Sequence, residues 1–227
     1  MRLAKIAGIQ VSVHWSWLVI GAIEIEYRRA NYSSLAWNIA EYLSLFLIVL
    51  LHEFGHALAC RQVGGQADRI ILWPLGGVAF VAPPPRPGAH LWSIAAGPLV
   101  NVVLFPVLLG LNVWAARAGL WDSAPDSANF LRDVFWINTG ILLFNVLPIY
   151  PLDGGQILRS LLWFAIGPIR SLKAATIVGF IGAVGFVLLA ILWQSIWIGI
   201  MAGFLFMNCR RAWLQARAWS EYERSRR

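Results

Sequence analysis

Charged residues are scarce in this chain of 227 residues, because only 13% of them are Asp, Glu, Lys or Arg. A typical soluble domain has about 25% charged and about 45–50% apolar residues, whereas 59% of this chain is hydrophobic. This balance excludes an ordinary water-soluble globule and a disordered chain. Cysteine is also scarce, and the spacing of Cys60 and Cys209 argues against a disulfide framework or a cysteine metal site. Long apolar runs and 13 tryptophans are abundant instead, so the sequence predicts a polytopic membrane protein.

The long apolar runs predict about six membrane crossings in one membrane-embedded domain over residues 1–227. A helix needs roughly 20 apolar residues to cross the hydrocarbon core of a bilayer. The fourth expected span is interrupted near residues 148–151, where two prolines occur. We therefore predict an all-α membrane fold with spans at about residues 11–25, 39–63, 91–116, 130–167, 174–193 and 196–213.

The segment between the second and third spans, residues 64–90, has a different character. Residues 64–69 are too polar to cross a membrane, and residues 70–81 contain β-branched residues, aromatics and paired glycines. These features are typical of short strands that turn back on themselves. A proline-rich connector, residues 83–88, follows and cannot be helical. We expect a short membrane-associated β-hairpin in a loop on the cytoplasmic side.

The positive charges predict the orientation, because Lys and Arg are retained on the cytoplasmic side of a membrane. With both termini in the cytoplasm, the outer side receives only four of the 18 basic residues, namely Arg28, Arg29, Arg117 and Arg132. We therefore expect a multi-pass protein of the cell membrane whose basic tail, residues 214–227, meets anionic lipids of the inner leaflet. The net charge of +7 reflects this topology, and we expect no nucleic-acid partner.

The second span contains the pattern His52-Glu53-Phe54-Gly55-His56. Two histidines four residues apart project from one face of a helix, so both imidazoles can reach one ion. Neutral imidazole suits Zn²⁺, and a glutamate directly after the first histidine can act as a general base. The alternative is a polar cluster that binds neighbouring helices. Three ionisable groups in an otherwise apolar helix are hard to justify by packing alone.

A catalytic zinc takes three protein ligands and keeps one position open for water. The acidic residues Glu24, Glu26 and Glu41 lie near the outer ends of their expected spans. His52 lies about 20 Å along the second span from Ile39, and the fourth span descends in the same direction. Asp153 then lies at a depth in the membrane similar to that of His52. We therefore predict Asp153 as the third ligand of one zinc per chain. Capping of the following helix by Asp153 is the alternative, and both roles can coexist.

Two motifs together resemble the site-2 protease family of intramembrane zinc metalloproteases. These are HEFGH at residues 52–56 and NVLPIYPLDGG at residues 145–155, and further family patterns match at residues 13–16, 74–79 and 96–101. The resemblance implies zinc held by two histidines and one aspartate, a glutamate base, and cleavage of membrane-spanning helices within the bilayer. The chain departs from many members of the family in one respect, because we expect it to be a compact form without the PDZ insert or the CBS domain that they carry.

The resemblance implies further roles near the metal. Asn145 would orient the substrate or the tetrahedral oxyanion, and Asn101 would donate to backbone or substrate or make a purely structural helix contact. A helical peptide bond is shielded, so a substrate helix must unwind before cleavage. The strand around Gly76, Gly77 and Val78 could hold the unwound segment by main-chain hydrogen bonds, or could serve only as a structural lid.

The leading hypothesis is therefore a zinc endopeptidase that cuts transmembrane segments of membrane-protein substrates, gated by its own helices or by a regulatory membrane partner. One alternative is an ion- or proton-coupled transporter that uses the same His, Glu and Asp cluster. Transporters typically contain two related broken helices in repeated halves, whereas one span is broken here and no repeat is evident. A second alternative is a catalytically inactive binding protein, against which the retained ligands and Glu53 argue.

Overall fold

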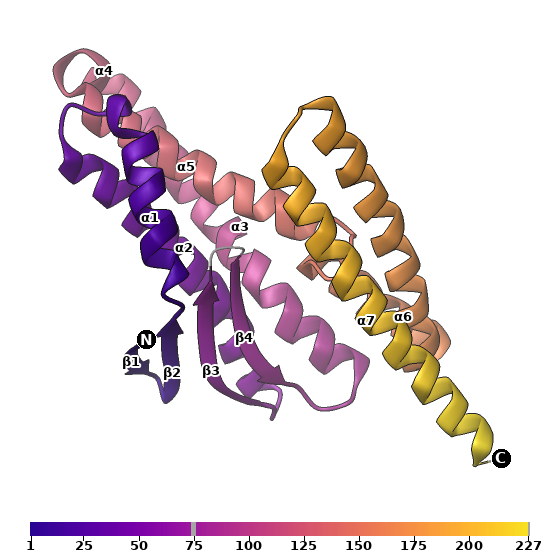
Figure 1. Ribbon diagram of the computed structural model, residues 1–227. Coiled ribbons are helices and arrows are strands. Elements are labelled where there is room, and N and C mark those ends of the chain that lie inside the picture. Colours follow the sequence, from indigo (N-terminus) through magenta and orange to yellow (C-terminus); the bar gives the residue numbers. More distant parts are fainter. Residues whose placement is uncertain (74–75, 227) are drawn as a thin grey trace. The chain divides into compact units, whose positions relative to one another are not determined.

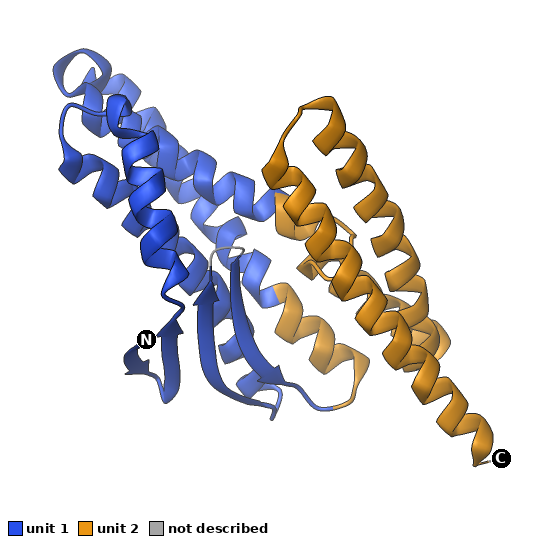
Figure 2. Cartoon of the chain, in the orientation of Figure 1, with its two compact units in different colours: residues 1–84, 96–143 blue, residues 85–95, 144–227 orange. Residues whose placement is uncertain are grey.

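The computed structural model describes residues 1–73 and 76–226 (Figure 1). The fold is mostly helical with one small sheet, which agrees with the expected class. The chain divides into two compact units (Figure 2). The first unit comprises residues 1–84 and 96–143, and the second comprises residues 85–95 and 144–227. The helices are α1 (Ser16–Tyr27), the 3-10 turn η1 (Arg29–Asn31), α2 (Leu35–Gln62), α3 (Pro87–Arg117), α4 (Leu120–Ser123), α5 (Pro125–Val146), α6 (Asp153–Leu192) and α7 (Ile196–Ser225).

Three helices within the described residues are long and apolar enough to cross a membrane, namely α2, α3 and α6. Helix α1 has only 12 residues, fewer than the roughly 20 that a crossing needs. Helix α6 has 40 residues and contains a kink at Gly167, whose φ of 79° is not helical. The expected count of about six crossings is not confirmed by these helices and stays a prediction.

A four-stranded sheet forms part of the first unit. Its strands are β1 (Arg2–Ile6), β2 (Ile9–Val13), β3 (Gln66–Trp73) and β4 (Gly76–Ala82), in the spatial order β1-β2-β3-β4. Strands β2 and β3 are parallel, and the other two pairs are antiparallel. Strands β3 and β4 form the expected hairpin, although Pro74 and Leu75 of the matching motif lie outside the described residues. Strands β1 and β2 were not expected from the sequence, and β2 occupies the start of the first expected span. The expectation of a non-helical connector over residues 83–88 is wrong at its end, because α3 begins at Pro87 and proline is tolerated in the first turn of a helix.

One face of the sheet packs against α2 and forms the core of the first unit. Residues of β2 alternate between buried and half-buried positions, as expected for a strand with one covered face. The buried side chains of this cluster include Ile9, Ile70 and Leu72 from the sheet, and Ala57 and Cys60 from α2. Helix α2 contacts both β3 and β4. This packing places the sheet directly over the helix that carries the HEFGH motif.

In the second unit, helices α6 and α7 pack along each other (Figure 2). Leu152, Ala183 and Leu205 form a buried cluster between them and the segment before α6. That segment, residues 147–152, separates α5 from α6 and contains a cis peptide bond between Tyr150 and Pro151. The expected break near residues 148–151 therefore separates two helices.

Candidate metal centre

The two histidines of the HEFGH motif converge on the buried side of α2. The Nε2 atoms of His52 and His56 lie 3.1 Å apart, and the residues are only 4% and 6% exposed. Two imidazole nitrogens bound to one tetrahedral zinc at 2.0–2.1 Å would be about 3.3 Å apart. The spacing of the two ring nitrogens therefore suits a shared metal ion.

Helix α3 approaches these ring nitrogens at a glycine. A Cβ atom built on Gly97 would lie 2.2 Å from Nε2 of His56 and 2.8 Å from Nε2 of His52. Any side chain at this position would displace the imidazoles. The absence of a side chain at Gly97 preserves the point where the two nitrogens converge. Both the donor atoms and the space around them thus fit a small metal ion.

The second ring nitrogen of His52, Nδ1, contacts a buried network of side-chain amides. Nδ1 of His52 lies 2.6 Å from Oδ1 of Asn101 on α3. The side-chain amide of Asn101 donates to Oδ1 of Asn138 on α5 at 2.8 Å, and Nδ2 of Asn138 donates to the Asn101 carbonyl at 3.1 Å. A metal-binding histidine almost always donates its second ring N–H to an oxygen acceptor, most often a carboxylate, a backbone carbonyl or water, and the Asn101 oxygen fills that place here. Asn101 was expected near the site, whereas Asn138 was missed, because nothing in the sequence sets it apart from the other asparagines of α5.

Strand β4 lies against Glu53. The backbone N–H of Ala79 donates to Oε2 of Glu53, with nitrogen and oxygen 2.7 Å apart. A Cβ on Gly77 would lie 2.3 Å from Cγ of Glu53, so the strand and the carboxylate are in close contact. Gly76 has a φ of 132° and Val78 is 42% exposed. Gly77 was expected near the site from the sequence, whereas Ala79 was missed, because any residue except proline can supply a backbone donor.

Asp153 and Asn145 belong to the second unit. Asp153 is the first residue of α6 and is buried, whereas Asn145 lies near the end of α5 and is half-buried. The first turn of α6 packs tightly against the preceding segment. A Cβ on Gly154 would lie 2.2 Å from the Val146 carbonyl oxygen, and one on Gly155 would lie 2.3 Å from the Tyr150 nitrogen. The two glycines therefore allow the segment that sets the position of Asp153 to fold back on the helix.

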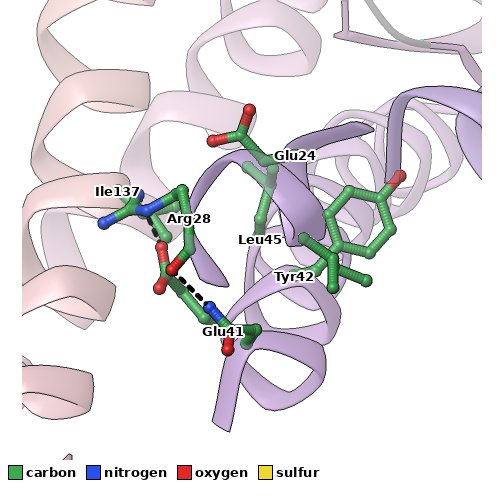
Figure 3. A pocket seen from close by; sticks show the side chains of 8 residues that line it. Glu24, Arg28, Glu41, Tyr42, Leu45 and Ile137 are labelled. Atoms are coloured by element: carbon green, nitrogen blue, oxygen red, sulfur yellow. Dashed lines mark hydrogen bonds and ion pairs between the residues drawn. The ribbon is translucent and has the colours of Figure 1, made fainter. Parts of the chain in front are cut away.

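A separate cluster of charges lies elsewhere in the first unit, around a cavity of about 100 Å³ (Figure 3). Arg28 connects the charges of this cluster. Its Nη1 is 2.6 Å from Oε1 of Glu41, and its Nη2 is 2.8 Å from Oδ2 of Asp133. Glu41 precedes His52 by 11 residues, or about 16 Å along α2. This cluster joins the end of α1 to α2 and α5, and it is distinct from the histidine pair.

A model of peptidase family M50 matches residues 40–117 and 115–191 of the chain. The chain belongs to peptidase family M50. Among its relatives is a zinc metalloprotease of Methanocaldococcus jannaschii, 32% identical over 179 residues, which cover 79% of this chain and 50% of the relative. Stage IV sporulation protein FB of Bacillus subtilis is 36% identical over 118 residues, which cover 51% of this chain and 38% of that protein. The chain thus spans half or less of the length of these curated relatives.

A solved structure of a site-2 protease confirms the resemblance drawn from the motifs. The site-2 protease from Methanocaldococcus jannaschii matches with a TM-score of 0.64 and 25% identity, covering 94% of both chains. The relative named as a zinc metalloprotease and the buried histidine pair together indicate zinc as the metal. Membership in M50 and the apolar helices α2, α3 and α6 indicate a membrane location.

Proposed function

We propose that this chain is a zinc-dependent intramembrane endopeptidase, which hydrolyses peptide bonds within or near transmembrane segments of membrane-protein substrates. One observation carries the proposal. The paired Nε2 atoms of His52 and His56 and the intervening Glu53 lie buried on one apolar helix. Ionisable groups are expensive inside a membrane and usually mark a functional site. Membership in a peptidase family supports the same reading.

We propose His52, His56 and Asp153 as the three ligands of one zinc per chain. Each is buried and offers one ligand atom of a type that zinc accepts. When bound, zinc would lower the pKa of a bound water and polarise the scissile carbonyl. Asp153 follows a segment that is packed onto the first turn of α6, so its backbone is well placed to present a ligand in a fixed direction.

Glu53 is proposed as the general base. It neighbours His52 in the chain, and its carboxylate is oriented by the N–H of Ala79. A carboxylate held in this way can accept a proton from the attacking water and return it to the leaving amine. Asn145 is proposed to orient the substrate or the oxyanion, as the family resemblance implies. Asn101 contacts His52 and Asn138, which favours support of the metal ligand over contact with substrate.

Strand β4 is proposed to bind the unwound substrate segment. Among the described strands it pairs with β3 alone and therefore lies at an edge of the sheet. Val78 and Phe80 on this strand are exposed. An extended peptide can add to such an edge by main-chain hydrogen bonds. The contact between Gly77 and Glu53 would then bring the bound peptide close to the general base.

The proposed partners follow from the membrane setting. Substrates are transmembrane proteins, and a membrane partner or the helices themselves would regulate access. Both termini are proposed to lie in the cytoplasm. The basic residues near the end of α7 support this orientation, because they suit the anionic inner leaflet.

The decisive experiment compares the wild type with Glu53→Gln and with the control Glu26→Gln, which alters an exposed residue of α1. Zinc per chain is measured by atomic absorption, and cleavage is measured on single-span reporter substrates in detergent. We expect one zinc in all three proteins and cleavage by the wild type and the control only. A zinc-free wild type, or an active Glu53→Gln protein, would overturn the proposal.

A further inference from the structure

We infer that Asn138 is a positioning residue that fixes which nitrogen of His52 is available to the metal, although Asn138 touches neither the histidine pair nor Glu53 in the contacts described above. The inference rests on the proposed function, because it concerns the same zinc site. Its basis is a chain of hydrogen bonds that begins at a backbone carbonyl and ends at an imidazole.

The first link has only one direction. The backbone carbonyl of Asn101 can accept a hydrogen bond but cannot donate one. The Asn138 side-chain atom that faces it at 3.1 Å must therefore be Nδ2. This contact fixes the orientation of the Asn138 amide, and the other atom of that amide, Oδ1, must face the Asn101 side chain.

The direction then passes along the network. Because Oδ1 of Asn138 is an acceptor, the Asn101 atom 2.8 Å away must be the donor Nδ2. Oδ1 of Asn101 is then left to face Nδ1 of His52 at 2.6 Å. An amide oxygen only accepts, so Nδ1 of His52 carries the proton. A neutral imidazole protonated at Nδ1 keeps its lone pair on Nε2, the atom that lies beside Nε2 of His56.

Because the network is buried, neither amide can reverse its orientation at low cost. Asn101 and Asn138 are both 0% exposed, so water cannot replace a missing partner at low cost. Reversing either amide would place two donors or two acceptors against each other. The network thus selects one tautomer of His52, and the selection starts at Asn138 on α5 and crosses α3 before it reaches α2.

Loss of Asn138 would release this selection. The Asn101 amide could then turn and present Nδ2 to His52, which would favour the proton on Nε2 and block metal binding there. Mutating the outer hydrogen-bond partners of metal-bound histidines typically costs 10–100-fold in metal affinity. We expect a loss in this range for Asn138→Leu, which keeps the branching at Cγ but can neither donate nor accept.

Asn112 offers a matched control. Asn112 lies on α3, like Asn101, and it joins α3 to α5, because its Nδ2 donates to the carbonyl of Leu131 at 3.0 Å. Asn112→Leu therefore removes an interhelical asparagine bond without altering the network at His52. Zinc affinity of the full chain in detergent is measured by competition with a chelating dye. Asn138→Leu should bind zinc at least 10-fold more weakly, whereas Asn112→Leu should stay within about twofold of the wild type.

A rescue variant separates positioning from packing. The carboxylate that Asn101→Asp introduces accepts through either oxygen, so it cannot turn a donor toward His52. Asn101→Asp alone sets its second oxygen against Oδ1 of Asn138, so the rescue is tested in the Asn138→Leu background, where that acceptor is removed. There the double variant Asn101→Asp/Asn138→Leu should bind zinc about 10-fold more tightly than Asn138→Leu. A purely structural role for Asn138 would leave the double variant as weak as Asn138→Leu.

The tautomer of His52 is measured in the zinc-free wild type, so this measurement does not depend on whether any variant folds. The chain has four histidines, so long-range ¹H–¹⁵N spectra of histidine-labelled protein are sparse enough to assign. We expect His52 to carry its proton on Nδ1. An Nε2 proton on His52, equal losses of affinity in Asn138→Leu and Asn112→Leu, or no rescue by Asn101→Asp would each overturn the inference. A wild type that binds no zinc would instead count against the proposed function.

Discussion

The N–H of Ala79 donates to Oε2 of Glu53 across 2.7 Å, so a strand at the edge of the sheet holds the proposed general base. A carboxylate bound in this way moves when the strand moves. If a substrate peptide pairs with β4, binding would act directly on the orientation of Glu53. This coupling would make proton transfer sensitive to how the strand is occupied.

The contact between β4 and Glu53 predicts a specific effect of Gly77→Ala. The added methyl group would meet Cγ of Glu53 at 2.3 Å, so the strand or the carboxylate must shift. A small misplacement of a catalytic group can cost on the order of 100-fold in rate. We expect cleavage of a single-span reporter to fall at least about 10-fold while zinc per chain stays unchanged. Ala82→Ser, at the exposed end of the same strand, is the control, and loss of zinc in Gly77→Ala would contradict the prediction.

Gly97→Ala should have the opposite signature, because it acts on the metal ligands. Its methyl group would lie 2.2 Å from Nε2 of His56, so we expect zinc content well below that of the wild type, with activity lost in parallel. Gly110→Ala serves as the control, since the space around Gly110 in the same helix is open. Alanine also favours helix over glycine by about 1 kcal/mol, so the control should be at least as stable as the wild type. Normal zinc content in Gly97→Ala would show that the ring nitrogens do not converge on the metal.

The parts of the site that depend on side-chain spacing within one element could be predicted from the sequence. The i, i+4 spacing of His52 and His56 sets both rings on one helix face, and the composition of residues 70–81 predicted the hairpin that β3 and β4 form, although β3 begins earlier, at Gln66. Strand β2 was missed although Ile9, Val11 and Val13 alternate with polar residues. The alternation is only five residues long and continues into an apolar run, which imitates the start of a membrane span.

Contacts between distant elements could not be predicted in the same way. Asn101 and Asn138 are 37 residues apart, and no periodicity relates two positions on different helices. The bond from Ala79 to Glu53 involves a backbone N–H, which every residue except proline possesses. Such contacts depend on how elements pack, and the motif at residues 52–56 indicates only that some group must orient its side chains.

Gly155→Ala tests whether the segment before α6 sets the position of Asp153. The new methyl group would lie 2.3 Å from the backbone nitrogen of Tyr150, and backbone atoms cannot move aside as a flexible side chain can. We expect the segment to shift and zinc affinity to fall by about 10-fold or more, as for other disturbed metal ligands. Gly185→Ala lies in the same helix with open space around it, so it should bind zinc like the wild type. Equal affinities in both variants would argue against Asp153 as a ligand held by this packing.

The charge cluster around Arg28 predicts a loss of stability that is independent of zinc. Arg28 binds both Glu41 and Asp133, whose side chains are only 7% and 10% exposed. Arg28→Met keeps much of the aliphatic length but leaves two buried carboxylates without this cation, and breaking a buried ion pair typically costs about 3–5 kcal/mol. Arg29→Met removes a neighbouring arginine whose bond to Glu26 is exposed, and such pairs contribute about 0–1 kcal/mol. Thermal unfolding in detergent should therefore show a much lower Tm for Arg28→Met than for Arg29→Met, with one zinc per folded chain in both.

A triple variant tests the electrostatic cause of this loss. Adding Glu41→Gln and Asp133→Asn to Arg28→Met should recover part of the lost stability, because the neutral amides no longer need the cation. Similar Tm values for the two single variants would show that the cluster does not hold α1 to α2 and α5.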